Sequence, residues 1–277
     1  MTLALTRRAF AITALGVGFA QSVLPVSAAA IATPADGLDV AEVKIPVADG
    51  TIPGYRARPA GGKAEAVVIV TQEIFGVHEH IKDLCRRLAK SGYYAIAPAL
   101  YARQGDPAAA PDIDTLVKDI VSKVPDAQVM SDLDATGAFA LTELADTSKL
   151  AITGFCWGGR IVWLYAAHNP ALKAGAAWYG KLVGTPDELH PKHPIDLVAE
   201  LKAPVLGLYG GQDKGIPLDT VEQMRAALVA AHNPSKIEVY ADAPHGFNAD
   251  YRDSYVEADA KDAWAKMLAW FAANGAA

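Results

Sequence analysis

The most restrictive feature of this sequence is a short apolar run that leads into a glycine-rich turn and then into a helical pattern. The run at 150–153 is followed by Gly154-Phe155-Cys156-Trp157-Gly158-Gly159. Such a turn holds its central residue in a strained conformation, and glycines beside it leave room for neighbouring backbone. The pattern therefore predicts a sharp strand–turn–helix that presents Cys156 at the end of a strand. A buried structural cysteine in an ordinary turn is the alternative.

Short apolar runs alternate with longer amphipathic segments along most of the chain. The apolar runs predict buried parallel strands at 66–70, 93–97, 150–153, 174–178, 205–209 and 237–240. The amphipathic segments predict helices at 79–90, 128–144, 160–167, 218–231 and 256–271. Together they predict an α/β protein with a doubly wound, mostly parallel sheet flanked by helices. Two further runs around Asp49-Gly50, at 40–47 and 52–58, predict an N-terminal antiparallel hairpin. The turn-rich connections at 102–125 and 181–202 are expected to shape a substrate site.

The N-terminus has the pattern of an export signal. Thr6-Arg7-Arg8-Ala9-Phe10 precedes an apolar run at 11–20 and a small-residue tract at 26–30. We therefore expect a twin-arginine signal peptide over residues 1–30 and a single domain over residues 31–277. This predicts the export machinery as a partner, a periplasmic or secreted location, and no membrane association after cleavage. A membrane anchor is the alternative, but spanning requires about 20 apolar residues.

Charge and cysteine content argue against several other classes of protein. The chain carries 25 Lys and Arg against 31 Asp and Glu, a formal net charge of -6, which argues against nucleic acid as a partner. Its two cysteines are too few for a disulfide framework. Cys85 lies on an apolar stripe at helical spacing and is expected in the core. The oligomeric state is open, and a monomer is favoured.

A thiol nucleophile needs a base, and the base needs a carboxylate to orient it. Asp213 follows the run at 205–209 in a tight turn, and His245 follows the run at 237–240. The order Cys156, Asp213, His245 is that of the α/β-hydrolase fold, so the three predict a catalytic triad. Asp242 is a rival orienting residue, but it lies only three residues before His245.

No metal or organic cofactor is expected. The pair His190-x-x-His193 could bind a metal in principle, but no Cys or third His lies nearby in sequence. The remaining histidines suit solvated positions at helix ends.

Five motifs together resemble the dienelactone hydrolase family, from residue 40 to residue 272. They are Gln72-Glu73-Ile74-Phe75-Gly76, Tyr101-Ala102-Arg103, Gly154-Phe155-Cys156-Trp157-Gly158-Gly159, Gly210-x-x-Asp213 and His245-Gly246-Phe247. The resemblance is specific for the family and less so for the substrate.

The resemblance implies four further site residues. Glu73 would contact the resting thiol and, displaced by substrate, help take the proton from it. The backbone N–H groups of Ile74 and Trp157 would form the oxyanion hole. Arg103 would bind a substrate carboxylate through its planar fork of donors. The family's second arginine would follow the histidine closely, where this chain has 247–249, and Arg252 lies out of register.

These observations favour a cysteine-dependent hydrolase of small lactones or esters, of the carboxymethylenebutenolidase type, that acts through a thioester. One alternative is a carboxylesterase for small neutral esters. Another is a non-catalytic binding protein of the same fold. A thiol redox sensor would require Cys85 within disulfide distance of Cys156.

Overall fold

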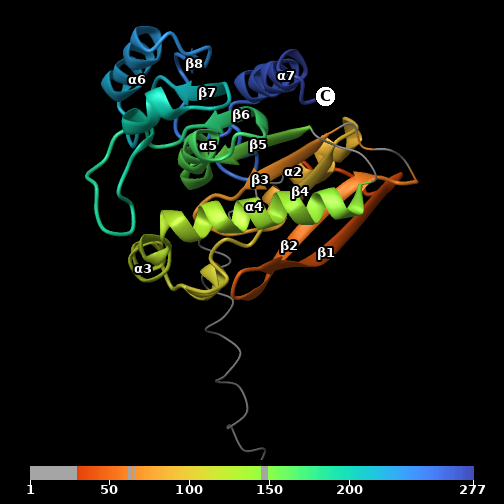
Figure 1. The fold of residues 1–277 in the computed structure, drawn as a ribbon. Helices are drawn as coiled ribbons and strands as arrows, with labels where there is room; N and C mark the ends of the chain where they lie inside the picture. The colour runs from red at the N-terminus through yellow and green to blue at the C-terminus, as the bar shows by residue number, and fades with distance from the viewer. Residues whose placement is uncertain (1–29, 62–63, 65, 145–148) are drawn as a thin grey trace, which may run out of the picture.

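An eight-stranded sheet runs through the computed structural model of the protein, which describes residues 30–61, 64, 66–144 and 149–277 (Figure 1). The strands are β1 (Leu38–Val47), β2 (Gly50–Pro59), β3 (Val67–Thr71), β4 (Tyr94–Pro98), β5 (Leu150–Phe155), β6 (Leu172–Trp178), β7 (Val205–Gly210) and β8 (Lys236–Tyr240). The twin-arginine motif lies outside the described residues, so export stays a prediction.

The strand order is β1-β2-β4-β3-β5-β6-β7-β8. β2 pairs antiparallel with both β1 and β4, and every other pairing is parallel. The predicted hairpin and mostly parallel sheet are therefore confirmed. In a parallel sheet of this kind the carboxyl ends of the strands lie at one edge, where the loops after β3, β5, β7 and β8 can meet.

Helices cover both faces of the sheet. They are α2 (Glu79–Lys90), α3 (Ile113–Asp119), α4 (Asp126–Glu143), α5 (Trp157–His168), α6 (Leu218–Ala230) and α7 (Glu257–Ala273). In Figure 1, α4 and α5 cross in front of the strands and α2 lies behind them. Cys85 is fully buried on α2, as its apolar stripe predicted, and both cysteines are free. None of the described helices is long and apolar enough to cross a membrane.

The connection at 102–125 contains a helix that its sequence did not reveal. The Asp112 side chain accepts a hydrogen bond from the Thr115 N–H and caps the start of α3. Only Leu116 of this helix is buried, so no apolar stripe marks it. The connection at 181–202 is irregular except for a 3-10 helix at Pro194–Glu200.

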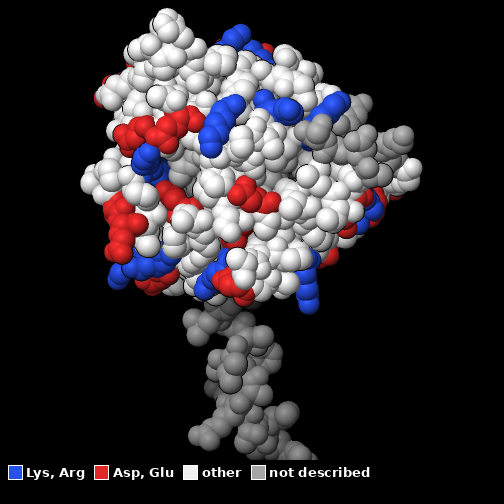
Figure 2. All heavy atoms as spheres, viewed as in Figure 1, with Lys and Arg blue, Asp and Glu red and all other residues white. Residues whose placement is uncertain are grey.

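Among the described residues, the face shown in Figure 2 has no large patch of charge of a single sign. Acidic and basic side chains are dispersed there over a predominantly uncharged surface. The described residues form no basic stripe of the kind typical of nucleic-acid recognition on this one face.

The turn between β5 and α5 is built by close backbone approach. Cys156 has φ 56° and ψ -115°, and few non-glycine residues adopt such a positive φ. A Cβ on Gly154 would lie 1.9 Å from Thr71 Oγ1 and 2.3 Å from the Gly158 carbonyl oxygen. That threonine hydroxyl donates to the Thr153 and Gly158 carbonyls and so joins the end of β3 to the turn. The turn therefore needs glycine at position 154.

We predict that Gly154→Ala lowers the free energy of unfolding by about 3 kcal/mol or more, because the added methyl must displace backbone. Equilibrium urea unfolding measures the change. Gly137→Ala is the matched control: its Cβ meets only side-chain carbons, the nearest at 3.6 Å, in the middle of α4. That substitution should raise stability by about 0.5–1 kcal/mol. Equal effects of the two substitutions would contradict the steric argument.

Candidate active site

The structure brings Cys156, His245 and Asp213 together at the carboxyl edge of the sheet. Asp213 follows β7, and His245 follows β8. His245 Nδ1 lies 2.7 Å from Asp213 Oδ2. The other carboxylate oxygen of Asp213 accepts the Gly215 and Ile216 N–H groups at 2.8 and 3.1 Å. The carboxylate is thus fixed on both oxygens and can orient the imidazole.

His245 is poised to carry a positive charge. Burial lowers its pKa, but the hydrogen bond to Asp213 and the interaction with Cys156 outweigh burial and raise the pKa to about 10. The Tyr179 ring packs edge-on against the imidazole at 5.1 Å. Asp242, the rival carboxylate, is exposed to solvent. The structure therefore selects Asp213 as the partner of His245.

Two backbone N–H groups lie where an oxyanion hole is expected. Trp157 is the first residue of α5, so its N–H has no partner within the helix. Ile74 lies in a turn after β3, closed by a hydrogen bond from the Gly76 N–H to the Glu73 carbonyl. Within the described part of the chain, the Ile74 N–H has no hydrogen-bond acceptor. Both donors therefore remain available to a ligand.

Close backbone packing joins the end of β3 to the start of α5. A Cβ on Gly158 would lie 2.5 Å from the Thr71 carbonyl oxygen and 2.6 Å from that of Gln72. The loop that carries Ile74 therefore begins against the first turn of α5.

Glu73 has partners other than Cys156. Its side chain is buried, and Oε2 accepts a hydrogen bond from the Tyr251 hydroxyl at 2.6 Å and lies 3.5 Å from His78 Nε2. Burial alone would raise the pKa of Glu73, but His78 and the charge of Arg252 bring it well below its usual range. No hydrogen bond joins Glu73 to Cys156 among the described residues. The carboxylate is bonded to Tyr251 instead, and its contact with the resting thiol stays a prediction.

Arg103 is engaged elsewhere. Its Nε donates to Asp49 at 2.7 Å, and its Nη1 donates to Asp132 at 2.7 Å. Its Nη2 also contacts both carboxylates. The guanidinium thus joins the β1–β2 turn to α4. Its donors are already used by two aspartates, which does not fit the predicted role of binding a substrate carboxylate.

Arg252, which the sequence placed out of register, lies at the site instead. Its guanidinium lies over the rings of Phe75 at 4.7 Å and Tyr251 at 5.1 Å. It forms no ion pair with any carboxylate of the described residues, although its charge acts on Glu73 and Tyr179. Consecutive turns, closed by bonds from the Ala249 N–H to the Gly246 carbonyl and from the Arg252 N–H to the Ala249 carbonyl, shorten the path from His245.

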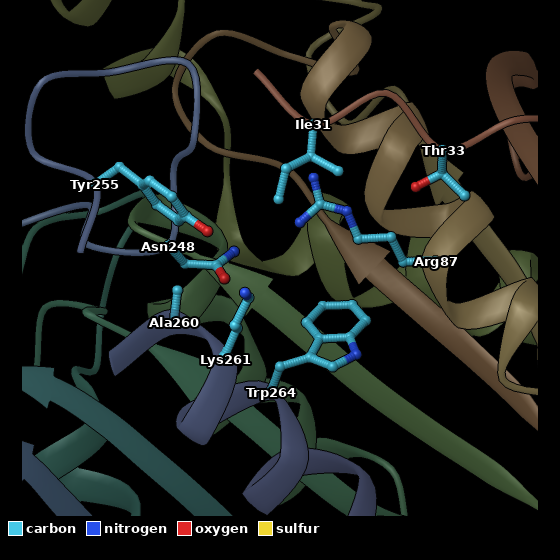
Figure 3. A pocket seen from close by; sticks show the side chains of 8 residues that line it. All are labelled: Ile31, Thr33, Arg87, Asn248, Tyr255, Ala260, Lys261 and Trp264. Carbon is cyan, nitrogen blue, oxygen red and sulfur yellow. The ribbon is translucent and has the colours of Figure 1, made fainter. Parts of the chain in front are cut away.

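A cavity of about 580 Å³ adjoins this region. Gln72, Phe75, His78 and Tyr101 contribute to its wall. A second cavity, of about 230 Å³, lies between the N-terminal segment, α2, the loop after His245 and the start of α7 (Figure 3). None of the predicted site residues lines it. The described residues contain no group of three or more side chains suited to hold a metal ion.

The sheet order, the strained turn at Cys156 and the hydrogen-bonded Asp213–His245 pair define an α/β-hydrolase. The comparisons with known proteins then narrow the class. The model of the dienelactone hydrolase family matches residues 52–275, and the chain belongs to this family. As a member, it is a hydrolase that acts on ester bonds.

Similar proteins carry related names. A Methylorubrum extorquens protein provisionally named carboxymethylenebutenolidase is 59% identical over 275 residues, which cover 99% of this chain and 94% of that protein. An Escherichia coli K12 protein of the same provisional name is 54% identical over 93% of this chain and 96% of its own length. A crystal structure from Klebsiella pneumoniae, described provisionally as a dienelactone hydrolase, is 60% identical with a TM-score of 0.83 and covers 85% of this chain and 98% of that chain.

We predict that Asp213→Asn lowers the pKa of His245 from about 10 toward the usual 6.5, because the anionic partner is lost. NMR titration of labelled histidine side chains measures it. The pKa of His245 is higher in the folded protein than in the unfolded chain, so protonation of His245 stabilises the fold. This stabilisation is complete below pH 6.5 and is lost as the pH rises through about 10. The stability advantage of the wild type over Asp213→Asn should therefore shrink across that window. A pKa that is unchanged in the variant would show that Asp213 does not stabilise the imidazolium.

Proposed function

We propose that this protein hydrolyses small lactones or esters by acyl transfer to Cys156. The observation that carries the proposal is the arrangement of Cys156 on a strained turn beside His245, whose other ring nitrogen is bonded to Asp213. A thiolate is the reactive form of cysteine, and an adjacent imidazolium and a helix N-terminus both favour it. The family membership supports an ester-bond substrate.

Each of these residues has one role in the proposed first half-reaction. The sulfur of Cys156 attacks the carbonyl carbon, and the N–H groups of Ile74 and Trp157 stabilise the negative oxygen that forms. Because His245 Nδ1 is bonded to Asp213, Nε2 is the nitrogen that gives its proton to the leaving oxygen. The C–O bond breaks and a thioester remains on Cys156. In a lactone the leaving oxygen stays attached to the acyl group.

The second half-reaction returns the enzyme to its starting state. His245 takes a proton from water, and the resulting hydroxide adds to the thioester carbonyl with the same two N–H groups as donors. The C–S bond breaks, the acid leaves, and Cys156 and His245 share the proton again. We assign no proton-transfer step to Glu73, because its carboxylate is bonded to Tyr251.

Arg252 favours an anionic substrate for this reaction. A guanidinium without a carboxylate partner, held by two aromatic rings beside the oxyanion loop, is a ready ligand for a substrate carboxylate. The provisional names of the relatives point to the same class, since a carboxymethylene-butenolide is a lactone that bears a carboxylate. The rival is a carboxylesterase for neutral esters, which the engagement of Arg103 by two aspartates favours.

We predict that Cys156→Ala lowers kcat/KM for p-nitrophenyl acetate and cis-dienelactone by a factor on the order of a thousand or more, because the covalent route is lost. Steady-state assays of both substrates measure it. Rapid acid quenching of the wild type followed by intact-mass analysis should show an acetyl group on Cys156. Cys85→Ala is the control and should retain full activity. Equal activity of wild type and Cys156→Ala would refute the mechanism.

We predict that Arg252→Gln lowers kcat/KM for cis-dienelactone by about 10- to 100-fold, because a charge-assisted contact with the substrate carboxylate is lost. Hydrolysis of p-nitrophenyl acetate should change less than about threefold, since that ester has no carboxylate to bind. Arg103→Gln is the matched control and should affect the two substrates equally. If Arg252→Gln slows both substrates to the same extent, the neutral-ester alternative takes precedence.

A further inference from the structure

The smaller cavity, of about 230 Å³, has no part in the reaction described above. Its wall comes from four parts of the chain: the N-terminal segment, α2, the loop after His245 and α7 (Figure 3). The volume equals that of about seven or eight water molecules in the liquid, which is enough for a small organic molecule. No residue of the proposed catalytic machinery lines it, so the cavity is separate from the candidate active site.

Arg87 of α2 is fixed in this cavity with one donor unused. Its Nε donates to Asp83 at 2.6 Å, and its Nη2 pairs with Asp250. Asp83 also accepts the Thr33 N–H at 2.6 Å, which holds the N-terminal segment against α2. Within the described part of the chain, no hydrogen bond uses Nη1 of Arg87. Figure 3 shows the guanidinium directed into the cavity, so Nη1 is available to a ligand.

Asn248 presents a second unused donor. The residue is only 2% exposed, and the nitrogen of its carboxamide has no hydrogen-bond partner among the described residues. In Figure 3 its side chain points into the cavity beside the Tyr255 hydroxyl and across from Arg87. A buried donor without a partner is unfavourable, and nearly all buried donors in proteins are paired. The Asn248 nitrogen therefore gains a partner when a molecule with an acceptor enters the cavity.

The charge and the apolar surface of the wall define the kind of molecule that fits. Lys261 of α7 lies at the exposed rim and is the second cation of the lining, and none of the eight lining residues is acidic. The indole of Trp264 and the side chain of Ile31 provide apolar surface beside these donors. Cationic and N–H donors suit a carboxylate, whereas an indole and an aliphatic side chain suit an apolar body.

We propose that this cavity binds a small carboxylate that carries an apolar, preferably aromatic, body. The carboxylate would accept from Arg87, Asn248 and Lys261, and the apolar body would pack on Trp264. The inference does not rest on the proposed function. Asn248 and Tyr255 belong to the loop that carries His245, which a hydrogen bond from the Val256 N–H to the Phe247 carbonyl closes at 3.0 Å. A bound carboxylate would therefore join that loop to α2.

Titration of the ¹⁵N-labelled protein with benzoate tests the site, with the indole N–H resonances followed by NMR. The Trp264 resonance is assigned by its loss in Trp264→Phe. It should shift and saturate with a Kd of about 1 mM or tighter. Acetate has the charge without the ring, and benzamide has the ring without the charge. Each should bind at least about tenfold more weakly than benzoate, because each lacks one of the two contacts.

Two variants of the wall should weaken benzoate binding. Asn248→Asp keeps the shape but replaces the donor with a negative oxygen, so the Kd should rise at least about tenfold. Lys261→Gln should raise the Kd about three- to fivefold, since the lost cation is partly exposed. Lys266→Gln is the matched control: Lys266 also lies on α7 and pairs with an acid one turn earlier, Asp262, at 2.8 Å, but it does not line the cavity. That substitution should leave the Kd unchanged.

Two further variants separate this site from the candidate active site. Cys156→Ala and Arg252→Gln should both bind benzoate as the wild type does, so failure of the proposed function would leave the inference standing. A Trp264 resonance that does not respond to benzoate would refute the inference. Equal binding of benzamide or acetate would refute the assigned class of ligand. Loss of the response in Arg252→Gln, with no effect of Asn248→Asp, would place benzoate at the active site and overturn the inference. If Asn248→Asp does not fold, equal Kd values for Lys261→Gln and Lys266→Gln would contradict it.

Discussion

The rest of the site depends on the backbone at Cys156. Its positive φ is an unfavourable conformation, and such strain persists only where surrounding packing enforces it. Here the enforcement comes from Gly154 and Gly158, which let the ends of β3 and β5 and the start of α5 approach within a distance that no side chain allows. The same approach sets the loop after β3 against the helix. One steric arrangement therefore presents Cys156 at the end of β5, frees the Trp157 N–H and brings the loop that carries Ile74 to the start of α5.

The parallel sheet supplies the second constraint. Strands β5, β7 and β8 end at one edge, and each is followed by one of the three predicted triad residues. Because Asp213 is held by two backbone N–H groups, its charge is fixed in place before it meets His245. The imidazole is consequently oriented by the fold itself and does not depend on the substrate for alignment. Preorganisation of this kind is what makes electrostatic stabilisation effective in catalysis.

The sequence predicted the features that depend on local patterns and missed those that depend on side-chain direction. Strand runs, the hairpin and the order of Cys156, Asp213 and His245 all follow from periodicity and turn chemistry, and the structure places them as expected. Arg103 was assigned by motif, yet the approach of Asp49 and Asp132 could not be read from residues so distant in the chain. Arg252 was set aside because turns that shorten the path from His245 do not show in residue spacing.

Under the proposed function, the charge of Arg252 links substrate binding to the ionisation of Glu73. The guanidinium has no carboxylate in direct contact, yet its charge helps to keep the buried Glu73 ionised. A substrate carboxylate that binds Arg252 would neutralise part of that charge and weaken the support for Glu73. The hydroxyl of Tyr251 and the ring of His78 then carry more of the task of holding the carboxylate. An anionic substrate would therefore place a demand on the contacts of Glu73 with Tyr251 and His78 that a neutral ester would not. Under the proposed mechanism, this difference gives a physical reason for the aromatic and charged residues that surround Glu73.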